Sequence, residues 1–292
     1  MDILSEITDH KRIEVELQKQ AVSPEQLREQ VRDLMENSPA PRRSMKRALA
    51  SSPAGIIAEF KRRSPSKGWI YETAKADEIP AAYEAAGASA ISILTDAKFF
   101  GGSLRDIRTA RPLVDIPILR KDFIIDEYQL LQARIAGADA VLLIAACLTQ
   151  EECADLTARA HALGLEVLLE IHSPRELAYI SKDVDMVGIN NRNLGTFVTD
   201  VENSFRIAGQ LRQTIADARN VPDAQDSSDT PRNLPLLVSE SGISHPETIC
   251  RLRTAGFRGF LIGETFMKTP QPGDALKGFI QGIEETEAQK SL

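Results

Sequence analysis

Short apolar runs recur along the chain from about Ala54 onward, and most of them end in polar or charged residues. Stretches of helical periodicity separate these runs, which is the order expected of repeated βα units. The runs predict strands at Ile56–Phe60, Ala90–Thr95, Pro117–Phe123, Ala140–Ala145, Glu166–Ile171, Met186–Asn190, Leu236–Ser241 and Gly259–Gly263. Their number and order favour an α/β fold, a closed (β/α)8 TIM barrel with its active site at the carboxyl ends of the strands.

Helices are predicted between the strands, and several of them stop at a glycine that can adopt the left-handed conformation of a C-cap. The clearest are Ile79–Ala86, Glu127–Ala136, Gln150–Leu163 and Pro246–Ala255. The segments AAGASAISIL, IAGADAVLLI and TAGFRGFLIG share the order helix, glycine, turn and strand. The chain therefore carries a weak internal repeat of one βα unit.

Two segments fall outside the repeat. Residues 1–50 contain amphipathic stretches at Ile3–Leu17 and Pro24–Met35, which predict extra N-terminal helices packed before or across the barrel. The segment Ala218–Asn233 is polar and lacks apolar periodicity, so we expect a mobile loop on the N-terminal rim, away from the chemistry. We expect residues 1–292 to form a single barrel domain with 1–50 as a helical extension.

The composition of the chain argues against nucleic acid and membranes as partners. The formal net charge of the 292 residues is -7, and no lysine-rich run is present, which argues against binding nucleic acid. The start of the chain carries no apolar signal region, and no stretch is long enough to span a membrane. The chain has three cysteines, Cys147, Cys153 and Cys250, an odd number without the close spacing of a zinc site. They fit a reducing cytoplasm, and we expect them at core or helix positions.

Charged and polar side chains gather at the predicted strand ends, among them Glu59, Lys61, Ser64, Lys121, Asp122, Glu170, His172, Asn190 and Arg192. Residues two apart in a strand face the same way, so one side of the rim would collect two lysines, two carboxylates and an arginine. Such a mixture shifts pKa values and makes acid and base roles accessible at neutral pH. A structural salt bridge could explain any one residue, but their joint occurrence favours a catalytic site.

Two further turns suggest an anion site. Ser241-Gly242 and Gly263-Glu264 follow the seventh and eighth predicted strands. Phosphate-binding barrels present backbone N–H groups and a short helix N-terminus at these places. A tight turn explains either pair alone, but their position in the strand order favours a phosphate site.

Long motifs in the chain resemble those of the indole-3-glycerol phosphate synthase family, in the same order and over nearly the whole length. They are IAEFKRRSPSKG (57–68), FFGGS (99–103), PILRKDFIID (117–126), GADAVLLI (137–144), GINNRNL (188–194), SESGIS (239–244) and LIGE (261–264). The resemblance implies ring closure of 1-(2-carboxyphenylamino)-1-deoxyribulose 5-phosphate to indole-3-glycerol phosphate, with loss of carbon dioxide and water. It implies no cofactor and no metal.

The resemblance also implies roles for individual residues. Lys121 would be the general acid and Glu170 the general base, with Lys61 and Glu59 as partners in the site. The remaining implied contacts are Asn190 and Arg192 to polar groups of the substrate, Ser64 with Lys61 near its carboxylate, Phe100, Phe123, Leu142 and Leu194 around the aromatic ring, and Ser241, Gly242, Gly263 and Glu264 at the phosphate. Glu264 departs from a serine found in some members, which matters little if its backbone N–H is the donor.

Other interpretations stay open from the residues alone. A buried lysine beside a carboxylate on a barrel strand is also how a Schiff-base lyase of the aldolase type begins. Phosphoribosylanthranilate isomerase fits less well, because a cysteine would be expected where the first strand ends in Glu59 and Lys61. A binding or assembly protein without turnover is a further alternative, as is association with other tryptophan-pathway enzymes. His172 could support Glu170, although a solvated loop histidine is the simpler interpretation.

Overall fold

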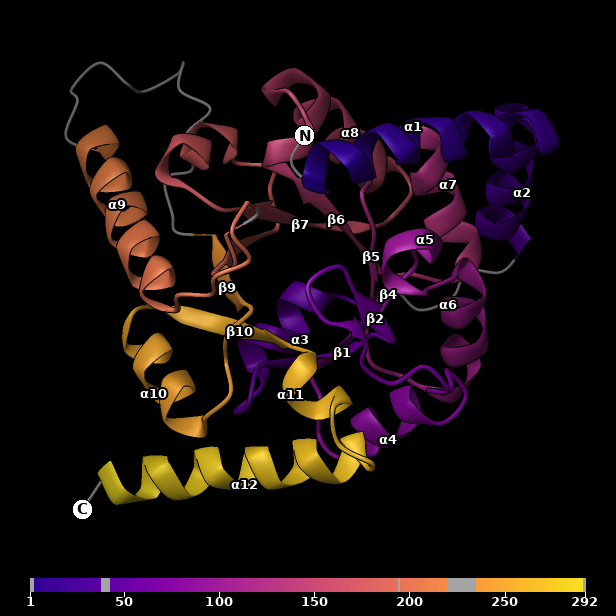
Figure 1. The fold of residues 1–292 in the computed structure, drawn as a ribbon. Coiled ribbons are helices and arrows are strands. Elements are labelled where there is room, and N and C mark those ends of the chain that lie inside the picture. The colour runs from indigo at the N-terminus through magenta and orange to yellow at the C-terminus, as the bar shows by residue number, and fades with distance from the viewer. Residues whose placement is uncertain (1–2, 38–42, 194, 220–234, 291–292) are drawn as a thin grey trace.

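Eight parallel strands close into a barrel in the computed structural model, which describes residues 3–37, 43–193, 195–219 and 235–290 (Figure 1). The strands are β1 (Ile56–Phe60), β4 (Ala90–Leu94), β5 (Ile118–Lys121), β6 (Ala140–Ile144), β7 (Glu166–Ile171), β8 (Met186–Asn190), β9 (Leu236–Glu240) and β10 (Phe257–Ile262). Each barrel strand pairs with the one that follows it, and β1 pairs with both β4 and β10, which closes the sheet. The predicted (β/α)8 barrel is therefore confirmed.

Helices surround the barrel and cover its outer face (Figure 1). The longer ones are α4 (Ile79–Ala85), α6 (Leu104–Ala110), α7 (Glu127–Ala136), α8 (Gln150–Ala162), α9 (Glu202–Arg219), α10 (Pro246–Thr254) and α12 (Pro272–Lys290). Local sequence sets their ends: Thr149 and Glu152 form a capping box that starts α8, and Gly137 ends α7 in the left-handed conformation. Short helices α5 (Ala97–Phe100) and α11 (Glu264–Met267) follow β4 and β10, with 3₁₀ turns η1 (Arg111–Leu113), η2 (Ala145–Cys147) and η3 (Pro174–Tyr179) elsewhere.

The polar segment predicted as a loop from Ala218 begins later than expected. Ala218 and Arg219 are the last residues of α9, whose apolar face buries Ile207 and Leu211 in the core. Packing of that face carries the helix past the point where apolar periodicity stops. Residues 220–234, which hold the rest of the predicted loop, lie outside the described residues.

In the part of the chain that the structure describes before β1, three helices are present, α1 (Ile3–Ala21), α2 (Pro24–Asn37) and α3 (Met45–Ser51). The first two confirm the predicted N-terminal helices and pack their apolar side chains against α7. The third was not predicted. Its Met45 and Leu49 are fully buried among residues of the barrel interior, so α3 closes the end of the barrel where the strands begin.

Side chains on each strand alternate between the barrel interior and the layer beneath the helices. On β7, Leu168 belongs to the interior cluster, whereas Val167 and Leu169 belong to the larger cluster beneath the helices. Glu170 shares the inward side with Leu168 because it lies two residues further along. Apolar side chains therefore fill the barrel interior near the end where the strands begin. The inward polar residues lie at the other end, where the strands finish.

Cys153 and Cys250 lie buried in α8 and α10 as expected, whereas Cys147 is half-buried in the 3₁₀ turn η2. No helix within the described residues has both the length and the apolar character needed to cross a membrane.

Candidate active site

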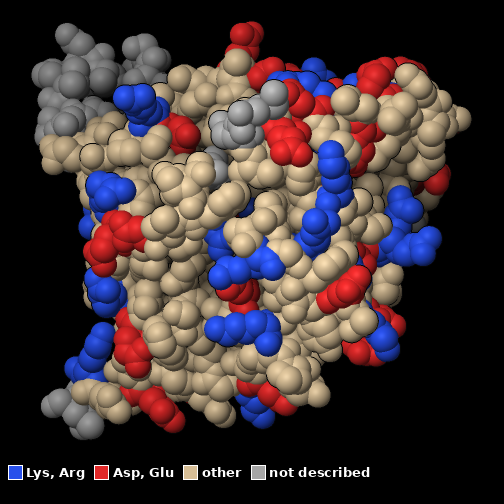
Figure 2. Space-filling model, viewed as in Figure 1, with Lys and Arg blue, Asp and Glu red and all other residues tan. Residues whose placement is uncertain are grey.

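One cavity of about 520 Å³ opens at the carboxyl ends of the barrel strands. Figure 2 shows lysine and arginine side chains gathered around the middle of this face, with acidic side chains among them. The predicted residues that line the cavity are Glu59, Lys61, Ser64, Phe100, Lys121, Phe123, Leu142, Glu170, Asn190, Arg192, Ser241, Gly242, Gly263 and Glu264. Leu194 lies outside the described residues. The structure thus brings together side chains and turns from all eight barrel strands or the loops that follow them.

One charged contact of the cavity joins Lys121 to Glu170. Lys121 ends β5 and Glu170 lies on β7, so the two side chains meet across the intervening strand, with Nζ 2.9 Å from Oε2. Asn190 on β8 donates from Nδ2 to Oε1 of Glu170 at 3.1 Å. The carboxylate is therefore held from both sides in one orientation.

Both members of this pair carry the charge that acid and base chemistry needs. Burial alone would lower the pKa of Lys121, but Glu170, Glu240 and Glu59 outweigh it and raise the pKa of the ammonium. Burial alone would raise the pKa of Glu170, but the charge of Lys121 and the contact with His172 outweigh it and lower the pKa. At neutral pH the lysine is therefore a proton donor and the glutamate a proton acceptor.

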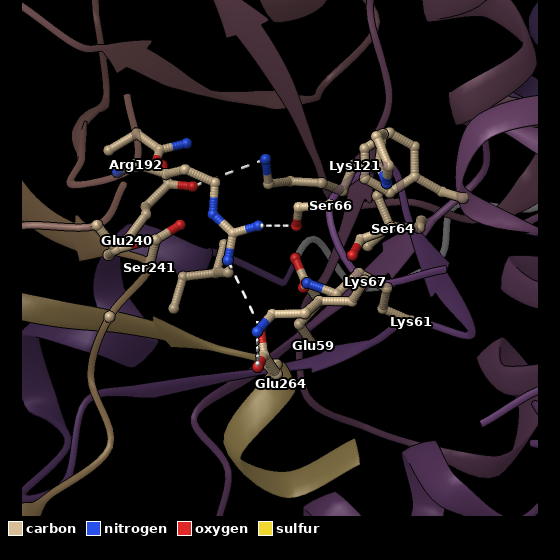
Figure 3. A pocket seen from close by; sticks show the side chains of 18 of the residues that line it. Glu59, Lys61, Ser64, Ser66, Lys67, Lys121, Arg192, Glu240, Ser241 and Glu264 are labelled. Atoms are coloured by element: carbon tan, nitrogen blue, oxygen red, sulfur yellow. Dashed lines mark hydrogen bonds and ion pairs between the residues drawn. The ribbon is translucent and has the colours of Figure 1, made fainter. Parts of the chain in front are cut away.

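A second lysine–glutamate pair lies on the first strand. Nζ of Lys61 is 2.5 Å from Oε1 of Glu59, and both side chains face the cavity (Figure 3). Gly263 passes so close to this pair that a Cβ atom there would lie 2.3 Å from Oε1 of Glu59. The glycine after β10 therefore makes room for the carboxylate as well as starting α11.

Glu240 is a third buried carboxylate in the site, and the sequence interpretation gave it no role. It ends β9, is 1% exposed, and its Oε2 lies 3.7 Å from Nζ of Lys121 (Figure 3). Within the described residues neither of its oxygens has a hydrogen-bond partner. Gly188 leaves space for it, since a Cβ there would lie 2.0 Å from Oε1. The available signal was its inward position two residues after Val238, at the polar end of an apolar run.

The balance of charges in the site determines whether Glu240 holds a proton. Three inward carboxylates, Glu59, Glu170 and Glu240, share the site with the two ammonium groups of Lys61 and Lys121. Burial raises the pKa of Glu240 well above its ordinary value, and the neighbouring Glu170 raises it further. Glu240 is therefore the carboxyl group that most readily holds a proton.

Replacing Glu240 by glutamine is expected to stabilise the fold as the pH rises. A carboxyl with a raised pKa contributes most to stability when protonated, below its unfolded-state pKa of about 4.3, and loses that contribution as pH increases. Glu240→Gln should match the parent near pH 4 and exceed it at pH 8, by about 1.4 kcal/mol for each pKa unit of displacement. Denaturant unfolding at both pH values measures this. Glu285→Gln on the exposed face of α12 is the control, and equal pH profiles for parent and Glu240→Gln would contradict the prediction.

Backbone turns and cations form the opposite end of the cavity. Ser241 and Gly242 both have positive φ, 66° and 79°, and Gly263 is the N-cap residue of α11. Arg192 donates to Oγ of Ser66 at 2.7 Å and lies 3.6 Å from Oε2 of Glu264 (Figure 3). Ser66 belongs to a hairpin of β2 (Arg63–Ser64) and β3 (Gly68–Trp69), a feature that was not predicted. This end combines N–H groups with positive charge.

Lys67 and Lys268 also line the cavity, and the sequence interpretation did not include them. Lys67 lies 3.7 Å from Oε1 of Glu264. Isolated basic residues in loops carry no periodic signal, so only the folded chain identifies them.

Apolar side chains form a third part of the cavity wall. The rings of Phe100 and Phe123 have centroids 5.9 Å apart at an interplanar angle of 38°, and Leu142 lines the same cavity. Ile3, Leu4 and Ile7 of α1 also line the cavity, which the sequence did not predict. The wall is suited to a planar ring, since it offers aromatic and aliphatic faces.

Two residues near the Lys121–Glu170 pair differ from what the strand ends suggested. Asp122 belongs to the residues that line the cavity, but its carboxylate is 2% exposed and accepts hydrogen bonds from Thr95 and Arg120. Its side chain alternates with that of Lys121 and so points to the outer layer. His172 is not a solvated loop residue, because its side chain is 10% exposed and its Nε2 lies 3.1 Å from Oε1 of Glu170. No cluster of three or more metal-binding side chains occurs among the described residues.

Comparison with known proteins agrees with this geometry. The sequence model of the family described as indole-3-glycerol phosphate synthase matches residues 4–279. An indole-3-glycerol phosphate synthase of Bacteroides thetaiotaomicron is 68% identical over 283 residues, which cover 97% of this chain and 99% of that protein. Enzymes of the same name from Syntrophobacter fumaroxidans and Magnetococcus marinus are each 40% identical, over 93% and 94% of this chain and 94% and 97% of theirs. The chain therefore belongs to the indole-3-glycerol phosphate synthase family and is a carboxy-lyase of tryptophan biosynthesis.

Proposed function

We propose that the cavity closes the indole ring of 1-(2-carboxyphenylamino)-1-deoxyribulose 5-phosphate to give indole-3-glycerol phosphate, carbon dioxide and water. The observation that carries this is the Lys121–Glu170 pair, a buried ammonium and carboxylate 2.9 Å apart between an apolar wall and a cationic end. The aryl ring of the substrate requires the apolar wall, its ketone requires the Lys121–Glu170 pair, and its phosphate requires the cationic end.

Lys121 acts in the closing step. Attack of the ring carbon on the ketone places negative charge on the carbonyl oxygen, and the ammonium delivers the proton that neutralises it. The carbon–carbon bond that forms is followed by loss of the ring carboxylate as carbon dioxide, whose bonding electrons return to the ring. The raised pKa of Lys121 keeps the ammonium protonated until the oxygen accepts the proton.

Glu170 acts in the dehydration step. The hydroxyl group made by ring closure leaves as water once it is protonated, and a proton is removed from the ring system to give the indole double bond. Glu170 is ionised and held by Asn190, so it accepts that proton in a fixed orientation. The departing water carries two protons on its oxygen, one from Lys121 and one from solvent, because loss of the carboxylate as neutral carbon dioxide consumes one proton. The proton that Glu170 takes from the ring system then passes to Lys121 across their 2.9 Å contact, which restores the pair.

The surrounding residues bind the three parts of the substrate. Lys61 and Ser64 contact the carboxylate that is lost, and Phe100 and Phe123 hold the aryl ring. The remaining contacts are Leu142 at the ring, Asn190 and Arg192 at the sugar hydroxyls, and the N–H groups of Ser241, Gly242, Gly263 and Glu264 at the phosphate. Loss of a carboxylate beside Lys61 and Glu59 fits their position next to the Lys121–Glu170 pair.

The test is the appearance of indole fluorescence when the protein is mixed with the anilino-ribulose phosphate. Carbon dioxide should be released with one equivalent per indole formed, without added metal or cofactor. The dephosphorylated substrate should react with kcat/KM lower by about 10²-fold or more, since it loses several charge-assisted hydrogen bonds. Substrate binding without carbon dioxide release would contradict the proposed reaction, and equal kcat/KM for both substrates would contradict the phosphate site alone.

A further inference from the structure

Helix α1 places one lysine side chain inside the wall of the barrel. Lys11 is 1% exposed, and its Nζ lies 2.9 Å from Oδ2 of Asp96 and 3.0 Å from Oδ1 of Asp122. It also lies 2.9 Å from Oε2 of Glu14 on its own helix. Burying an ammonium group is unfavourable unless opposite charges and hydrogen bonds compensate it. The proposed chemistry uses none of these groups.

Asp122 fixes the backbone around the proposed general acid, Lys121, which it directly follows in the chain. Its Oδ2 accepts hydrogen bonds from Thr95 at 2.6 Å and from Arg120 at 2.8 Å, and its Oδ1 accepts one from the N–H of Phe123 at 2.9 Å. Movement of the Asp122 carboxylate would therefore move the end of β5 with it.

Asp96 fixes the segment that carries Phe100, one of the two aromatic rings of the cavity wall. Asp96 caps α5, because its Oδ1 accepts a hydrogen bond from the N–H of Phe99 at 2.7 Å. That helix ends at Phe100, whose ring lies against the ring of Phe123. The ammonium of Lys11 thus joins the loops after β4 and β5, which carry both aromatic rings.

Charge balance explains why the lysine matters. Burial alone would lower the pKa of Lys11, but Asp122 and Asp96 outweigh it and raise the pKa. Two cations, Lys11 and Arg120, face the two buried carboxylates, and the partly exposed carboxylate of Glu14 also contacts Lys11. Without Lys11 a surplus negative charge would remain buried next to Lys121.

We propose that Lys11 is a positioning residue for the ring-closing reaction: by binding Asp122 and Asp96 together, it fixes the end of β5 so that Lys121 meets Glu170 at reacting distance. This inference rests on the proposed role of Lys121. It makes α1 part of the catalytic framework, although the lysine itself never touches the substrate.

The test compares two lysines of the same helix. Lys11→Met should lower kcat by about 10-fold to 10²-fold, because small displacements of a catalytic group have effects of that size. KM should rise by a smaller factor than kcat falls, since the groups proposed to bind phosphate and carboxylate stay in place and only the aromatic wall is loosened. Lys19→Met is the matched control. Lys19 pairs with Asp126 at 2.6 Å, outside the cavity, and its loss should leave kcat within about twofold.

The outcomes separate positioning from helix docking. Equal losses of kcat in both variants, or a rise in KM with unchanged kcat in Lys11→Met, would overturn the proposal. If Lys11→Met does not fold, the double variant Lys11→Met/Asp96→Asn removes the surplus charge and should fold with kcat still reduced. A double variant with parental kcat would show that only charge balance mattered, and would overturn the proposal. An inactive parent chain would overturn the proposed function as well, whereas an active parent with an unaffected Lys11→Met overturns this inference alone.

Discussion

Lys121→Ala is expected to lower kcat by about 10²-fold to 10⁴-fold, which is the usual contribution of a positioned general acid. The ammonium lies within 3.7 Å of two buried carboxylates, so its loss removes the proton donor and leaves both without their cation. Substrate affinity should change little, because the contacts proposed for the phosphate and the aryl ring do not involve Lys121. Single-turnover kinetics give the rate of ring closure, and an equilibrium titration of the inactive variant gives the affinity.

Lys277→Ala is the control for this experiment, since Lys277 lies exposed on α12. Its kcat should equal that of the parent. Parental kcat in Lys121→Ala would remove Lys121 from the mechanism. A raised KM with parental kcat would instead assign Lys121 to substrate binding, because it would then stabilise substrate and transition state equally.

Glu170→Gln should cause a loss of kcat in the same range, about 10²-fold to 10⁴-fold. Glutamine keeps the size of the side chain and an oxygen that can accept the hydrogen bond from Asn190, but it cannot take up a proton at neutral pH. Ring closure should proceed in the variant further than dehydration, so rapid mixing should detect an intermediate that accumulates before indole fluorescence appears.

Glu166→Gln is a matched control on the same strand. Glu166 lies at the other end of β7, where its carboxylate accepts hydrogen bonds from Ser44 and from the N–H of Lys46. This variant tests the loss of an inward carboxylate that is remote from the cavity. Its free energy of unfolding should fall while kcat stays within about twofold. A loss of kcat as large as that of Glu170→Gln would contradict the role of Glu170 as general base.

Periodicity along the chain predicted the barrel well because a parallel strand buried on both faces leaves an apolar run of its own length. Seven of the eight predicted strands begin within one residue of their observed starts, and the exception, β10, begins at Phe257 instead of Gly259. The start of β10 was missed because Arg258 is exposed and interrupts the apolar run. The helix α5 and the β2–β3 hairpin were also missed, because they are too short to show a period. The helix α3 was missed as well, although it has seven residues like the predicted α4.

Strand alternation predicted some residues of the site but not all of them. Alternation along each strand predicted that Lys121, Glu170 and Asn190 would face one cavity, and they line it together. Alternation applies equally to Glu240, but a single carboxylate before a Ser-Gly turn gave no reason to separate it from a solvated strand end. Its burial at 1% exposure depends on Gly188 of the neighbouring strand, which leaves the space for it.

The sequence alone therefore determined the order of βα units, the barrel and the end at which polar residues collect, because each of these depends on neighbours within one strand or helix. Only the tertiary structure decided which charges pair. Lys11 and Asp122 are 111 positions apart in sequence, and Lys121 and Glu170 are 49 apart, so their contacts exist only once the barrel has closed. Protonation states were decided at that level as well, because burial and the nearest charge set the pKa of Glu240 and Glu170 in opposite directions.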